Sequence, residues 1–137
     1  MPALQFLKLY AAAIIPFFII DLTWLGVVAR GFYAEQMGHL TRASVQWGPA
    51  ILFYLIYVAA IVVLCVKPGL ECNSIGHAMA LGALFGLAAY AAFDLTALAL
   101  LKDFPAKGAI VDLVWGTVLT ASVSGIAAAA GRALHIS

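Results

Sequence analysis

Long runs of apolar residues, separated by short polar clusters, make up most of the chain. None of these runs alternates apolar with polar residues, which is the pattern of a half-buried strand or of a membrane barrel. Each run approaches or exceeds the roughly 20 residues that a helix needs to cross a bilayer. The pattern therefore predicts four membrane-spanning helices, over about residues 6–29, 48–66, 75–101 and 108–130.

Proline, glycine and charged residues mark the expected ends of the four segments. The second should stop at the Lys-Pro-Gly triplet of residues 67–69, and the third before the Lys-Asp-Phe-Pro cluster of residues 102–105. The fourth should end near residues 131–132, and Pro16 predicts a kink within the first. We therefore expect an all-α integral membrane protein, a four-transmembrane-helix bundle that forms a single domain over residues 1–137.

The one long connection that this pattern predicts covers residues 30–46. Tyr33, Met37 and Leu40 recur within it at helical spacing, which is typical of a short helix lying in the membrane interface. An irregular loop would fit the same residues, and the sequence leaves both alternatives open.

The composition indicates that the chain lies in a lipid bilayer, and it limits the classes of partner that the chain can bind. Hydrophobic residues make up 66% of the chain and charged residues 9%, against about 45–50% and about 25% in soluble domains. The net charge of +1 provides no basic surface for nucleic acid and no polybasic anchor for acidic lipids. We expect membrane lipids, a small-molecule or lipid ligand and a second copy of the chain as partners, and no nucleic acid.

The first apolar run begins like a signal peptide, with Lys8 ahead of it. It continues through Asp21 to about Ala29, which is too long for the apolar region of a signal peptide. We therefore expect an uncleaved first membrane helix. Lysine and arginine are nearly balanced between the two faces. The N-terminal amine and two histidines give a slight preference for cytoplasmic termini.

Three aspartates interrupt the apolar segments. Asp21 and Asp94 lie nine and eight residues before a cation that marks the end of their segment, and Asp112 lies five residues after a cation that marks the start of its own. With a rise of about 1.5 Å per residue, all three approach the same membrane face. An aspartate in mid-helix costs about 2.5–3.5 kcal/mol on insertion scales, so we expect these side chains to face the bundle interior.

Aromatic residues accompany the aspartates. Trp24 and Trp115 follow Asp21 and Asp112 by three residues, a spacing that puts acid and indole on one side of each helix. An indole N–H can donate to a carboxylate, and its ring can form the wall of a pocket. Tyrosines of the second and third segments lie at similar depth. We predict a ligand-binding or proton-coupling site lined by Asp21, Trp24, Tyr54, Tyr57, Tyr90, Asp94, Asp112 and Trp115.

A structural explanation of the same residues stays open. Buried carboxyl groups can be protonated and simply bond one helix to another. Asp112 is near enough to the surface to act as a favourable negative charge at a helix N-terminus. The tryptophans could anchor the protein in the membrane interface.

Small residues recur every four positions on the third and fourth segments, which allows helices to approach closely. We expect helix packing through Gly82 and Gly86 on one stripe, and through Gly116, Thr120 and Ser124 on the other. Either stripe is a candidate homodimer interface unless it packs within the protomer.

Short repeated motifs suggest an internal duplication. Asp-Leu-Thr occurs at residues 21–23 and 94–96, and Trp-Gly occurs at residues 47–48 and 115–116. The matches support the hypothesis of two tandem parallel helical hairpins, related by an axis along the membrane normal.

Metal and cofactor chemistry have no support in the sequence. The three histidines are far apart, and neither Cys65 nor Cys72 has a partner at ligand spacing. We therefore expect no metal site and no cofactor, and we interpret the two cysteines as ordinary small residues.

Several short motifs together resemble a bacterial membrane family called domain of unknown function 2177 (DUF2177). The resemblance covers nearly the whole chain, and it implies a four-helix inner-membrane protein with no assigned activity. In the third segment the family often has asparagine after Asp-Leu-Thr, where this chain has Ala97. The motifs are Leu7-Lys8-Leu9-Tyr10, Asp21 with Trp24-Leu25-Gly26, Phe32-Tyr33, Gly38-His39-Leu40, Phe53-Tyr54, Asp94-Leu95-Thr96, Leu101-Lys102-Asp103 and Asp112 with Trp115-Gly116.

Three classes of function compete for these features. The leading hypothesis is a small transporter or solute-binding membrane protein, acting as a homodimer, whose carboxyl groups exchange protons when a cationic or aromatic-stacking substrate binds. The alternative is an intramembrane enzyme for a lipid or isoprenoid, with one aspartate as general acid and another stabilising a cation between tryptophan rings. The third is a structural or accessory membrane subunit without chemistry of its own.

Overall fold

The computed structural model describes the chain apart from residues 1–2, 25–30, 32–46, 103 and 135–137. The described part is helical and contains no strand. Four helical stretches within it are long and apolar enough to span a membrane, which confirms the predicted all-α bundle. The expected linker of residues 30–46 lies outside the described residues except for Gly31. The elements are α1 (Ala3–Thr23), α3 (Trp47–Ile61), η3 (Val62–Val66), α4 (Lys67–Glu71), α5 (Ile75–Leu100) and α6 (Ala106–Ala133).

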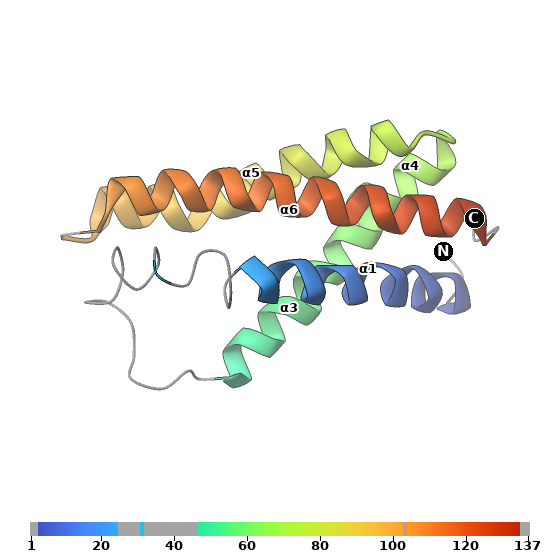
Figure 1. The fold of residues 1–137 in the computed structure, drawn as a ribbon, viewed down its shortest axis with the longest axis horizontal. Helices are drawn as coiled ribbons and strands as arrows, with labels where there is room; N and C mark the ends of the chain where they lie inside the picture. The colour runs from blue at the N-terminus through green and yellow to red at the C-terminus, as the bar shows by residue number, and fades with distance from the viewer. Residues whose placement is uncertain (1–2, 25–30, 32–46, 103, 135–137) are drawn as a thin grey trace.

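The two longest helices of the bundle pack against each other along their length. Helices α5 and α6 lie side by side and antiparallel, and they share the most extensive contact in the molecule (Figure 1). Helix α1 runs beside α6 and packs on it more than on α3. The start of α1, the α4–α5 turn and the end of α6 share one end of the bundle. The two halves thus pack differently, and the duplication stays a prediction.

The second span continues beyond the point where the sequence predicted its end. Helices α3, η3 and α4 form one stretch from Gly48 to Glu71, so the predicted stop at residues 67–69 is wrong. In η3 the Lys67 N–H bonds to the Val62 carbonyl, the wider turn of a π-helix. Because proline lacks an N–H and crowds the preceding turn, this widening lets the helix pass through Pro68.

The turn after α4 explains why the span ends where it does. Asn73 adopts a left-handed conformation with φ 52°, which asparagine tolerates better than most residues. The Ser74 N–H bonds to the Gly69 carbonyl at 2.8 Å, which closes the helix end. The Ser74 side chain then accepts a hydrogen bond from the His77 N–H at 3.0 Å and caps α5. Gly69 allows α4 to pack closely on α5, because a Cβ at this position would lie 2.5 Å from the Ala78 side chain.

The other described boundaries lie close to the expected ones, and the predicted end of the first segment near residue 29 lies outside the described residues. Helix α1 begins three residues earlier than predicted and continues as a helix through Pro16. Helix α5 matches its prediction to within one residue, and α6 extends the predicted segment at both ends. Cys65 is buried, Cys72 is exposed, and both thiols are free.

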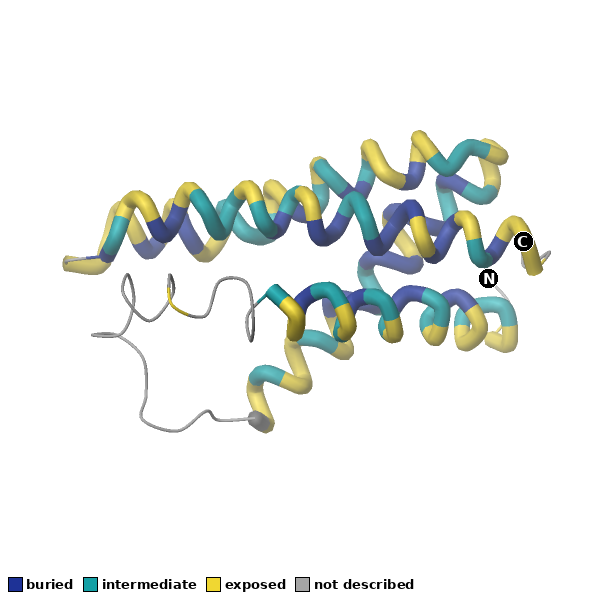
Figure 2. The backbone as a smooth tube through the Cα atoms, viewed as in Figure 1, coloured by how far each residue is buried: buried dark blue, intermediate teal, exposed yellow. Residues whose placement is uncertain are grey.

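The core lies where α1, the end of α3, η3 and α6 meet (Figure 2). Large apolar side chains of every span are exposed on the outside. On α1 the buried positions are Leu9, Ala13, Phe17 and Asp21, which recur every four residues. A stripe of this spacing stays on one helix face. Asp21 therefore continues the buried stripe of α1 and points into the bundle.

The two small-residue stripes pack against one another inside the protomer. A Cβ added to Gly82 would lie 2.5 Å from the Ser124 hydroxyl, and one added to Gly86 would overlap the Gly116 carbonyl. Gly116 is in turn covered by the Tyr90 ring. Both stripes are thus used between α5 and α6, and neither remains available as a dimer interface.

The glycine contact yields a matched pair of substitutions in α5. Gly86→Ala should lower the free energy of unfolding by about 1–3 kcal/mol, because the new methyl group meets backbone that cannot move aside. Gly76→Ala should be neutral or stabilising, since its methyl group has space and alanine favours helix. Unfolding by denaturant in detergent micelles measures both, and equal effects would contradict close packing at Gly86.

Candidate functional site

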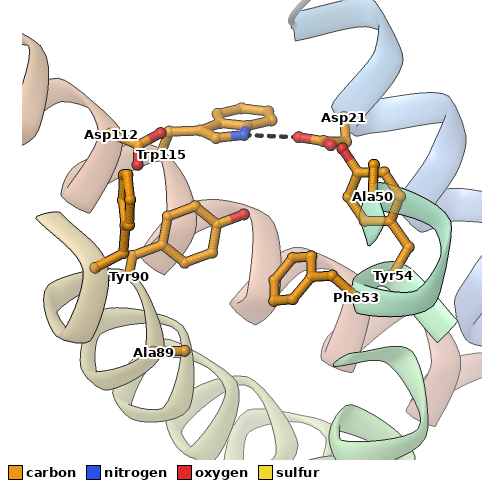
Figure 3. A pocket seen from close by; sticks show the side chains of 9 residues that line it. Asp21, Ala50, Phe53, Tyr54, Ala89, Tyr90, Asp112 and Trp115 are labelled. Carbon is orange, nitrogen blue, oxygen red and sulfur yellow. Dashed lines mark hydrogen bonds between the residues drawn. The ribbon is translucent and has the colours of Figure 1, made fainter. Parts of the chain in front are cut away.

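A pocket of about 470 Å³ lies within the bundle, among α1, α3, α5 and α6 (Figure 3). All four spans contribute to its wall, which is acidic and aromatic in character. Its volume falls in the range of small-molecule sites, about 300–1,000 Å³. The lining residues are Asp21, Ala50, Phe53, Tyr54, Ala89, Tyr90, Phe93, Asp112 and Trp115.

Asp21 is held from two other helices. The Trp115 indole N–H donates to its Oδ1 at 3.1 Å, across the contact between α1 and α6. The Tyr54 hydroxyl of α3 is also within hydrogen-bonding reach of the same carboxyl group. Trp115, which follows Asp112 by three residues on α6, thus donates its hydrogen bond to an aspartate of another helix. Three helices therefore meet at one buried carboxyl group.

The two predicted tryptophans form a stacked pair. The rings of Trp24 and Trp115 lie 4.3 Å apart between centroids, with 7° between their planes. Trp115 lines the pocket, whereas Trp24 is outside the lining and supports Trp115. Stacking and the bond to Asp21 together fix the Trp115 ring, which forms one wall of the pocket (Figure 3).

Asp94 lies behind the pocket rather than in its wall. Its side chain is 0% exposed, and neither carboxyl oxygen makes a hydrogen bond. The Asp112 carboxyl, which does line the pocket, is close enough to interact electrostatically with Asp94. A buried acid thus stands directly beside a pocket acid, which depth counting along the sequence suggested.

The three predicted tyrosines take different positions. Tyr54 and Tyr90 line the pocket, whereas Tyr57 is buried behind it. The Tyr57 hydroxyl shares a hydrogen bond of 2.7 Å with the Thr120 hydroxyl, which ties α3 to α6. Its ring also stacks on Phe53 at 5.3 Å between centroids. Tyr57 is therefore a supporting residue of the pocket wall.

Sequence reasoning missed four lining residues, on α3 and α5. A signal was present for three of them, because Ala50 is four residues before Tyr54, Phe93 is three residues after Tyr90, and Ala89 is four before Phe93. Such spacing puts two residues on one helix face. Which face meets the pocket depends on how each helix is rotated, and the sequence does not fix that rotation. Phe53 is the remaining residue of the four.

Within the described part of the chain, no group of three or more histidine, cysteine, aspartate or glutamate side chains could hold a metal ion. The residues that line the pocket offer the chemistry of carboxyl groups, phenols and an indole. Such groups bind cations, accept and donate hydrogen bonds, and exchange protons.

Comparison with curated proteins and with solved structures finds no match to the chain. A family model described as "Predicted membrane protein (DUF2177)" matches residues 6–129, which include all four spans at least in large part. The chain therefore belongs to this family of predicted membrane proteins, DUF2177.

Proposed function

We propose that the protein binds a small organic cation in the pocket and carries it across the membrane in exchange for protons. One observation carries the proposal: carboxyl groups from two helices, Asp21 and Asp112, converge inside the spans on a pocket with aromatic walls. Ionisable residues within a membrane are costly, and they commonly mark a substrate or ion pathway.

The pocket wall has the chemistry that recognises an organic cation. A carboxylate forms short, charge-assisted hydrogen bonds with an ammonium group. The faces of Trp115, Tyr54 and Tyr90 can attract a cation that has lost its hydration shell. A volume of about 470 Å³ lies in the range of sites for drug-sized ligands, so it has space for an aromatic cation of a few rings.

Proton exchange follows from the position of the acids. An ionised carboxylate inside a membrane protein needs a compensating charge, because its desolvation is expensive. In the empty pocket a proton supplies that charge, and a bound cation replaces it. Asp94 lies beside Asp112, and its carboxyl oxygens meet no donor from another residue, so the two acids can hold a proton between them.

Transport also requires a route to the opposite face, and four helices leave little room for one. We propose that a homodimer completes this route through a surface other than the contact between α5 and α6. In a bacterial inner membrane with cytoplasmic termini, the pocket would lie nearer the outer face.

Replacing either pocket acid should weaken cation binding. Ethidium is a suitable probe, because it is an aromatic cation with a permanent charge. Asp21→Asn and Asp112→Asn should each reduce its affinity by about tenfold or more, since each removes one charged partner. Isothermal titration calorimetry in detergent micelles measures the change. Glu71→Gln removes an exposed acid outside the pocket and should leave the affinity unchanged. Unaltered binding by the pocket variants would refute the proposed site.

Asp94→Asn separates proton exchange from binding. Ethidium neither gains nor loses a proton near neutral pH, so protons that appear on binding come from the protein. A pH-sensitive dye in weakly buffered solution should detect release from the unmodified protein and much less from Asp94→Asn, which still binds ethidium. Ser124→Ala alters another buried polar residue of the α5–α6 contact and should leave release intact. Full release from Asp94→Asn would exclude Asp94 from the exchange.

Exchange transport can be measured in proteoliposomes. A lumen more acidic than the medium should drive ethidium uptake, because each entering cation is exchanged for protons that leave. Asp21→Asn and Asp112→Asn should reduce this uptake to the level of protein-free vesicles. Uptake that does not depend on the pH difference would show that transport is not proton-coupled.

A further inference from the structure

Two rings belong both to the pocket wall and to the outer surface of the protein. Phe53 of α3 is 48% exposed and Phe93 of α5 is 61% exposed, although both line the pocket. The seven other lining residues are buried or partly buried. The surface exposure of the wall is therefore concentrated where α3 faces α5.

The backbones of the helices that carry these rings are not closely packed against one another. Helix α5 packs closely along α6 and contacts η3, but it has no comparable contact with α3. The second span therefore packs on α5 at η3 and, just before it, through Tyr57, whose ring stacks on Phe85 at 5.2 Å between centroids. No comparable backbone contact continues toward Phe53. The pocket lies between these two helices on that side (Figure 3).

The depth of the two rings places this opening in the hydrocarbon layer. Phe53 lies six residues inside the start of α3, and Phe93 lies seven residues before the end of α5. At about 1.5 Å per residue, both are roughly 10 Å inside their helix ends. The surrounding exposed side chains of α3, such as Leu52 and Ile56, are apolar. The opening therefore faces lipid acyl chains.

The pocket is polar on one side and apolar on the other. Asp21, Trp115 and Asp112 form one wall, and Phe53 and Ala89 lie across the space from them (Figure 3). A molecule that satisfies both walls needs a cationic group and an apolar part. The two carboxyl groups disfavour an anionic lipid headgroup at the same place.

We infer that the ligand is an amphipathic amine that enters the pocket sideways from the bilayer, between Phe53 and Phe93. Its ammonium group lies at Asp21 and Asp112, and its hydrocarbon part lies against the two phenylalanine rings. The ammonium position rests on the proposed function, whereas the lateral entry rests on the exposure and depth of the rings alone.

Trp115 provides an internal reporter for this inference, because it lines the pocket. The chain has three tryptophans, so Trp24→Phe combined with Trp47→Phe leaves only Trp115 to fluoresce. This variant is placed in phosphatidylcholine nanodiscs and titrated with a dodecylamine that carries a nitroxide near the amine. A nitroxide quenches fluorescence only at close range, so quenching reports entry into the pocket.

Two matched probes distinguish the contribution of the hydrocarbon tail from that of the ammonium charge. A labelled fatty acid with the same chain should quench Trp115 much less than the amine, because its carboxylate is repelled. A labelled amine without the hydrocarbon tail should also quench little at equal bulk concentration, because it does not concentrate in the bilayer. Equal quenching by the tailless amine would overturn lateral entry, and equal quenching by the fatty acid would overturn the amine as ligand.

Substitutions at the opening test the route itself. Phe93→Ala should weaken quenching by labelled dodecylamine by about three- to tenfold, the range expected when one aromatic contact is lost. Leu84→Ala changes a side chain of the same helix that is 65% exposed and outside the pocket wall, and it should have no effect. Equal effects of the two substitutions would contradict an entry beside Phe93.

The unmodified chain gives an independent measurement if the single-tryptophan variant does not fold. Dodecylamine should displace bound ethidium in nanodiscs, whereas butylamine and dodecanoate should not. If ethidium binds but dodecylamine neither displaces it nor quenches Trp115, the inference fails while the proposed cation site stands. If ethidium does not bind at all while labelled amine and labelled fatty acid quench Trp115 equally, the proposed cation site fails and the lateral opening stands.

Discussion

At Gly86 the backbones of α5 and α6 approach so closely that a methyl group would overlap the Gly116 carbonyl, and a methyl group at Gly116 would overlap the Tyr90 ring. Helices in lipid gain little from the hydrophobic effect when they associate, so such close packing largely determines how they pair. Gly116 follows Trp115 directly and Asp112 by four residues. On α5 the same stripe continues from Gly86 to Tyr90. This one contact therefore fixes the register of every pocket residue on the two helices.

Helix α1 is joined to this pair by polar and aromatic contacts in addition to apolar packing. Its buried stripe ends at Asp21, which accepts a hydrogen bond from Trp115, while Trp24 stacks on the same indole. A hydrogen bond is electrostatically stronger in an environment of low dielectric than in water. The carboxyl group that would bind a cation thus also positions α1. Occupation of the pocket would then act on the contact between α1 and α6 as well as on the ligand.

The sequence predicted what depends on length, hydropathy and position along a helix. The four spans follow from apolar runs, and the depth of Asp21, Asp94 and Asp112 follows from counting residues to the nearest cations. Counting gives height along the membrane normal but not rotation about the helix axis. For that reason the sequence placed Asp94 in the pocket wall, whereas the structure places it behind Asp112.

Features that arise from contacts between elements were missed for related reasons. Pro68 predicted the end of a helix, but a π-turn over Val62–Val66 allows the second span to continue. Exposed phenylalanines are ordinary in a membrane helix, so Phe53 gave no sign of lining a pocket until α3 and α5 were placed relative to each other. The two small-residue stripes could equally have served a dimer, and only the fold shows that they pack together.

The environment of Asp94 is the part of the molecule that packing alone explains least. Asp21 receives an indole donor, but α5 has Ala97 rather than tryptophan one turn after Asp94, and that alanine packs with Phe104 and Ala109. No donor from that side compensates the Asp94 carboxyl group, and its near neighbour Asp112 is another acid.

Two adjacent carboxylates in a medium of low dielectric repel each other strongly, so a proton between them is the least costly arrangement. A stability requirement alone would favour an apolar side chain at position 94, since replacing buried charged groups with apolar ones is often neutral or stabilising. Under the proposed function, the pair would hold a proton that a cation entering the pocket beside Asp112 displaces, and this role would account for an acid at position 94.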